Sequence, residues 1–140
     1  MNTQSFGRRV LFLLANVALV ASSIVLAAEG AAKKQVMTAE QHATFASKAE
    51  NVDGTQLHLH HVINCLVGPG GDGFDAKAGN PCKDQGNGAL NDMSISMEEQ
   101  QTLQQVLALA KLGTQIKSYK AAHDTAMAVR DLLEEANMGM

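Results

Sequence analysis

An all-α fold is predicted for this chain: a short N-terminal helical hairpin packed on one long C-terminal helix, with a disulfide-stapled glycine-rich loop between them. Three observations predict it. Helix-start patterns occur at two places, and apolar residues recur every three or four positions towards the C-terminus. Between these two halves lies a stretch rich in Gly, Pro and Asn, which is typical of a loop.

The first 28 residues have the pattern of a signal peptide. Arg8 and Arg9 form a short positive region, residues 10–26 are nearly all apolar, and small residues follow where a signal peptidase would cut. An uncleaved anchor is the alternative, because the apolar run approaches the ~20 residues that a membrane span needs. The small and polar ending favours cleavage. We therefore expect a periplasmic or secreted protein with no membrane attachment after cleavage.

Charge and aromatic content exclude some partners of the mature chain. Loss of Arg8 and Arg9 leaves nine basic against fourteen acidic residues, so the formal charge changes from −3 to −5. The mature chain has no tryptophan and only three aromatic residues, Phe45, Phe74 and Tyr119. An acidic chain that offers few rings for stacking is not expected to bind nucleic acid.

Turn and capping residues divide the first half of the mature chain. Thr38 and Gln41 have the spacing of a capping box, in which the hydroxyl and the side-chain amide satisfy backbone N–H groups at a helix start. Gly54 is suited to a reversal, and Thr55 could cap the next helix. The predicted segments are a flexible lead-in (29–37), a helix (about 38–51), a turn at Asp53-Gly54 and a second helix (about 55–67).

The second half is predicted to be a loop followed by a long helix. Seven glycines, two prolines and several asparagines fall between Gly68 and Asn91. Ser96 and Glu99 form a second capping box. Steady three-to-four spacing from Leu109 to Ala136 favours one helix over a hairpin broken near 113–118, because no strong turn dipeptide marks a reversal there. The predicted segments are a loop (68–95), one helix (about 96–136) and a frayed tail (138–140), within a single helical domain (38–137).

The two cysteines, Cys65 and Cys82, are predicted to form a disulfide. They bracket much of the glycine-rich loop, and an exported chain reaches an oxidising compartment. Neither belongs to a Cys-x-x-Cys motif, which disfavours redox catalysis and covalent haem attachment. We therefore expect a structural cross-link, with free metal-binding thiols as the alternative.

Histidines provide the candidate ligand site. His58 and His61 are three residues apart, so they lie on one face of the predicted second helix. Neutral imidazole nitrogens at this spacing can chelate one divalent ion, but two protein ligands hold a metal weakly. His42 or His123 is expected to supply the third. The alternative is that these histidines are ordinary packed residues.

Copper or zinc is the expected metal, because imidazole suits both ions. Methionines could extend the ligand set towards copper(I), and a histidine pair between helices could hold a non-covalent haem as a further alternative. No nucleophile elbow or phosphate-binding loop is present, so an enzyme is not expected. The competing hypothesis is a scaffold protein that uses the long helix to bind a partner or to dimerise.

Overall fold

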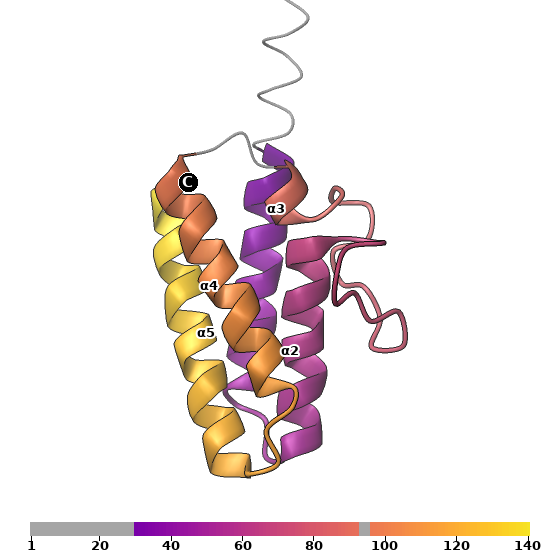
Figure 1. Ribbon diagram of the computed structural model, residues 1–140, viewed down its shortest axis with the longest axis vertical. Helices are drawn as coiled ribbons and strands as arrows, with labels where there is room; N and C mark the ends of the chain where they lie inside the picture. Colours follow the sequence, from indigo (N-terminus) through magenta and orange to yellow (C-terminus); the bar gives the residue numbers. More distant parts are fainter. Residues whose placement is uncertain (1–29, 93–95) are drawn as a thin grey trace, which may run out of the picture.

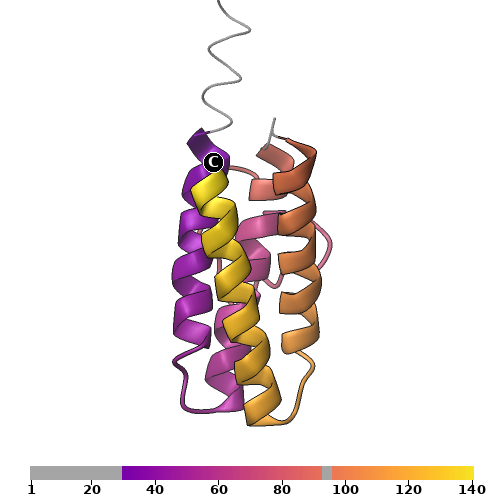
Figure 2. The same ribbon diagram turned by 90° about the vertical axis from the view of Figure 1, so that its left-hand side faces the viewer.

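The computed structural model describes residues 30–92 and 96–140, and these residues form helices and loops only. Four long helices run alternately down, up, down and up beside one another (Figures 1 and 2). This arrangement confirms the predicted all-α class. The helices are residues 30–46, α2 (Val52–Val67), the short α3 (Ala89–Asp92), α4 (Met97–Gly113) and α5 (Tyr119–Gly139). The predicted signal peptide lies outside the described residues.

The helix of residues 30–46 begins earlier than predicted, so the flexible lead-in is wrong. Thr38 is not a cap: its hydroxyl donates to the carbonyl of Lys34 (3.1 Å) in the middle of the helix. A buried stripe with a spacing of three or four residues explains the earlier start, because burying it stabilises a helix more than one cap does. The stripe is Ala32, Val36, Ala39, Ala43 and Ala46.

The reversal before α2 also differs from the prediction. Asn51, not Thr55, caps α2, and its side-chain oxygen accepts from the backbone N–H of Gly54 (2.8 Å). The turn therefore lies at residues 47–51, and the predicted Asp53-Gly54 turn is instead the first turn of α2. Asparagine is a stronger N-cap than threonine, which accounts for the choice.

The C-terminal segment is two helices, so the preferred single helix is wrong and the alternative break is correct. The start at Ser96 is as predicted, with its side chain accepting from the N–H of Glu99 (3.3 Å). After α4, the chain reverses through residues 114–118, where Gln56 of α2 donates to the carbonyl of Ile116 (2.8 Å). The reversal buries apolar residues of both halves against the bundle, whereas one straight helix would leave many of them exposed. They are Leu103, Val106, Ala110, Ala122, Ala126, Val129, Leu133 and Ala136.

Two further expectations change as a result. The apolar stripe of α5, which was expected to offer a partner surface, is buried inside the bundle. The predicted frayed tail is wrong as well, since α5 continues to Gly139 and Met140 packs against the core. Figure 2 shows α5 beside the 30–46 helix, and Asn137 donates to Glu40 of that helix (3.0 Å). No helix in residues 30–92 or 96–140 is long and apolar enough to span a membrane.

Gly113, at the end of α4, lies close against two other helices. A Cβ atom there would lie 2.5 Å from Leu59 Cδ1 and 3.3 Å from Thr125 Cγ2. Leu59 is fully buried and has little room to move. We therefore expect Gly113→Ala to lower the free energy of unfolding by about 1–3 kcal/mol, despite the better helix propensity of alanine. Urea unfolding measures this, with Gly30→Ala as the control because nothing lies within 4 Å of that Cβ. Equal or higher stability of Gly113→Ala would contradict the packing argument.

The loop between α2 and α4 is fastened to the bundle at several points. Cys65 and Cys82 form the predicted disulfide, with 5.2 Å between their Cα atoms. Gln35 of the first helix accepts from the N–H of Gly88 (2.8 Å) and donates to Asp92 (2.8 Å). The loop is therefore ordered by the disulfide and by side-chain hydrogen bonds to its backbone, and not by regular secondary structure.

Candidate metal centre

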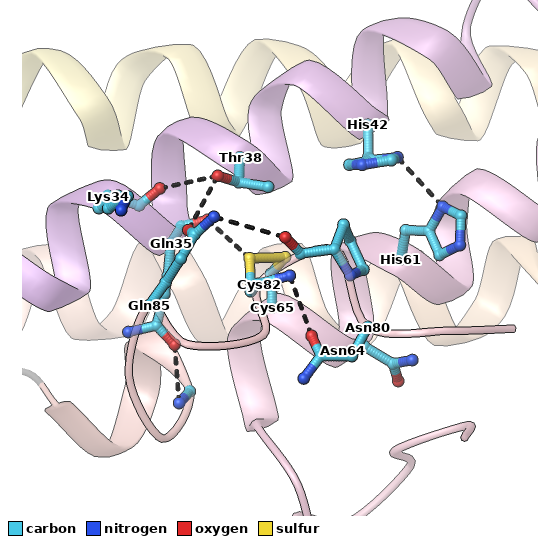
Figure 3. Close-up of a disulfide and its surroundings, with 12 residues drawn as sticks. Lys34, Gln35, Thr38, His42, His61, Asn64, Cys65, Asn80, Cys82 and Gln85 are labelled. Carbon is cyan, nitrogen blue, oxygen red and sulfur yellow. Dashed lines mark hydrogen bonds between the residues drawn. A yellow bond between two sulfur atoms is a disulfide. The ribbon is translucent and has the colours of Figure 1, made fainter.

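Three histidines meet where the 30–46 helix crosses the face of α2. His58 and His61 point from adjacent turns of α2, as their spacing predicts. His42 faces them from the first helix, and Figure 3 shows its ring directed at His61. All three side chains are partly exposed. The candidate site is therefore formed between two helices, near the surface.

The Nδ1 atoms converge. His42 Nδ1 lies 3.2 Å from His58 Nδ1 and 3.1 Å from His61 Nδ1. One ligand atom from each residue falls within 4.8 Å of the others. Two nitrogens bound to one tetrahedral zinc ion are about 3.3 Å apart, from metal–nitrogen distances of about 2.0–2.1 Å. The observed separations are thus close to those of a metal site.

A backbone carbonyl determines which ring nitrogen of His61 carries the proton. Its Nε2 lies 2.7 Å from the carbonyl oxygen of Ala78, in the disulfide-closed loop. A carbonyl can only accept, so Nε2 carries the proton. In the neutral ring Nδ1 then has a free lone pair, which points at His42. Metal-binding histidines commonly have such a partner on the other nitrogen.

Three neutral imidazole rings cannot form a hydrogen bond at both of the short Nδ1–Nδ1 contacts. If His42 Nδ1 carries a proton, it can donate to His61 but cannot accept from His58. If it carries none, it faces the lone pair of His61 without a hydrogen. Only one of the two short contacts can then be a full hydrogen bond. A cation at the centre would accept all three lone pairs at once.

A proton is a poor candidate for that cation. Burial, followed by repulsion from positive charge on His61 and then on His58, lowers the pKa of His42 to about 4. Burial, followed by repulsion from His61, also lowers the pKa of His58. The neutral rings favoured near pH 7 are the forms that bind metals.

These shifts predict a pH dependence for the metal-free protein. Because the pKa of His42 is lowered from 6.5 to about 4 in the folded state, the unfolded chain binds more protons between these values. Stability should therefore fall as the pH is lowered through this range. Urea midpoints at about pH 7 and about pH 4.5, measured with a chelator present, test this. His42→Gln should reduce the fall, whereas His123→Gln should not; an unchanged fall in His42→Gln would contradict the assignment.

Of the two candidate third ligands, the structure brings His42 to the site and not His123. His123 lies on α5, where its ring packs on Tyr119 (5.8 Å between centroids) and its Nδ1 is 3.7 Å from Asp124. His60 points away from the group, with its Nδ1 3.7 Å from Asp75. Both cysteines are in the disulfide, so neither offers a thiolate. Within the described chain, no carboxylate joins the three imidazoles.

The sequence prediction missed two features of the site. The Ala78 carbonyl is a backbone group, so no residue type marks it. Phe45, one turn from His42, packs against His42 and His58 with centroid separations of 5.5 and 5.4 Å. The sequence did offer one signal for Phe45: it lies three residues after His42, and residues at that spacing share a helix face. The ring therefore packs beside two of the three candidate ligands.

Comparisons with protein-family models, with curated proteins and with solved structures find no match. Assignment of a function to this chain therefore depends on the geometry of the histidine group. That geometry could hold a metal ion with three nitrogen ligands and one open position.

Proposed function

We propose that this protein binds a divalent transition-metal ion through the Nδ1 atoms of His42, His58 and His61. The observation that carries the proposal is the convergence of three Nδ1 atoms with separations of 3.1 and 3.2 Å. With neutral rings alone, one of these two contacts has no hydrogen between its nitrogens. A bound metal ion would instead accept the lone pairs of all three nitrogens. A water molecule or a small ligand would complete a tetrahedral site.

Zinc(II) and copper(II) fit the ligand set best. Three imidazoles suit both ions, whereas copper(I) favours thiolate or thioether sulfur. The group found in the described chain consists of histidines alone, which supports a nitrogen-binding ion. Haem is less compatible, because two axial nitrogens on opposite sides of one iron are about 4 Å apart, twice a metal–nitrogen distance.

Export to an oxidising compartment is the second part of the proposal. The disulfide and the signal-peptide pattern of residues 1–28 both support it. In such a compartment the cysteines are held as a cross-link, and the histidines are the nitrogen ligands left for a metal. We infer a non-catalytic role in capturing the ion, with uptake favoured near pH 7 and release favoured in acid.

Calorimetric titration of the mature protein with zinc or copper(II) tests the proposal. We expect one ion to bind per chain, with heat that disappears in His58→Ala, His61→Ala. The matched control is His60→Ala, because His60 lies on the same helix between the two ligands but points towards Asp75. Binding by the control and not by the double variant supports the site. Equal heats from all three proteins would exclude it.

A further inference from the structure

Asn64 is a fully buried polar residue in an otherwise apolar stretch of α2. It lies three residues after His61 and directly before Cys65. A buried amide without partners would be costly, so the bonds that it makes indicate its role.

All polar atoms of this amide are bonded to loop backbone. Its nitrogen donates to the carbonyls of Asp75 (2.7 Å) and Gly79 (2.6 Å), and its oxygen accepts from the N–H of Asp75 (2.8 Å). One side chain thus holds both ends of the segment 75–79. Figure 3 shows Asn64 beside the disulfide, with His61 on the next turn of the helix.

The segment held by Asn64 carries the carbonyl that contacts the candidate metal ligand. Ala78, immediately before Gly79, accepts from Nε2 of His61 (2.7 Å). Within the segment, the Asp75 carboxylate accepts from the N–H of Lys77 (2.8 Å), which tightens the turn. Gly79 has a φ of +93°, a conformation that glycine adopts without strain. The turn is therefore fixed from outside by Asn64 and from inside by Asp75.

We propose that Asn64 is a positioning residue of the metal site: by holding the 75–79 turn, it places the Ala78 carbonyl on His61 Nε2 and directs His61 Nδ1 to the ion. This inference rests on the proposed metal-binding function. Its consequence is that a residue without metal contact sets both the tautomer and the ring orientation of a ligand. Loss of such an outer partner typically lowers metal affinity about 10–100-fold.

Two variants remove hydrogen bonds that hold the 75–79 turn, one from α2 and one from within the loop. Asn64→Ala removes the three bonds to the turn. Asp75→Ala, in the partly exposed loop, removes the carboxylate's bonds to the N–H groups of Lys77 (2.8 Å) and Ala78 (3.4 Å) and its contact with His60. The matched control is Asp72→Ala. Asp72 lies in the same loop but pairs with Lys111 of α4. If Asn64→Ala does not fold, the near-isosteric Asn64→Leu takes its place, because it removes the same three bonds without leaving a cavity.

Two measurements separate positioning from mere stability. Nitrogen-15 NMR of the metal-free proteins should show His61 as a single Nε2–H tautomer in the wild type and in Asp72→Ala, and as a mixture in Asp75→Ala and in Asn64→Ala. Zinc affinity, from competition with a chromophoric chelator, should fall about 10–100-fold in the two positioning variants and stay unchanged in the control. A folded Asn64 variant that keeps both the single tautomer and the wild-type affinity would overturn the inference.

The NMR measurement also distinguishes this inference from the proposed function. If the wild type binds no zinc or copper, the proposed function fails. The tautomer of His61 in metal-free protein still reports whether Asn64 and Asp75 position the ring. A wild-type His61 that is already a tautomer mixture would reject the positioning role whatever the metal does.

Discussion

Replacing His42 with alanine is expected to remove the thermal stabilisation that zinc gives to this fold. A ligand that binds only the folded state stabilises it by about 2.7 kcal/mol at one hundred times its Kd. For a domain of this size that is roughly a 10 °C rise in Tm. His42 is the ligand that comes from the first helix, so without it the ion no longer joins that helix to α2. The remaining pair, His58 and His61, would bind more than about 100-fold more weakly, a larger loss than an outer partner causes.

Differential scanning calorimetry with and without zinc, and again after chelator, measures this effect. The metal-free His42→Ala protein should unfold near the wild-type temperature, because His42 is partly exposed and its removal leaves the buried stripe of its helix intact. His123→Ala is the control and should retain the full zinc response, since His123 lies with Tyr119 and Asp124 on α5. A His42→Ala protein that zinc stabilises as much as the wild type would show that the ion binds elsewhere.

Local signals in the sequence predicted part of this fold well. The helix start at Ser96, the helix that carries His58 and His61, and the Cys65–Cys82 cross-link were predicted from neighbouring residues or from the expected compartment, and the structure has all three. The apolar stripe of α5 was also predictable, because its spacing is regular. Each of these features is decided within a few turns of chain.

Long-range packing decided the features that the sequence did not reveal. The break after Gly113 is not marked by a turn dipeptide. It lets the apolar residues of both halves pack in the bundle, and Gly113 then lies so close to other helices that an added Cβ would be 2.5 Å from Leu59 and 3.3 Å from Thr125. His42 and His123 were equally good third ligands by residue type, and only the pairing of the first helix with α2 selects His42. The turn that supports His61 depends on the backbone of Ala78, which no sequence pattern marks.

Removing the disulfide with Cys65→Ala, Cys82→Ala is expected to lower the stability of the metal-free protein by about 3 kcal/mol. In the chain-entropy model a cross-link across a loop of about 15 residues contributes that amount by restricting the unfolded chain. The corresponding fall in Tm is more than about 10 °C for a small domain. Both cysteines are buried, so the truncations also remove packing in the core.

The same double variant should weaken zinc binding as well as the fold. Cys65 is four residues after His61, and Cys82 follows the turn that carries Ala78, so the cross-link and Asn64 together hold the loop against α2. We expect a smaller loss of affinity than in Asn64→Ala, because Asn64 still bonds to Asp75 and Gly79 when the cysteines are gone. Thermal unfolding in chelator and zinc competition give the two values separately. A Tm within about 2 °C of the wild type would show that Asn64 and the other loop bonds hold the loop without the cross-link.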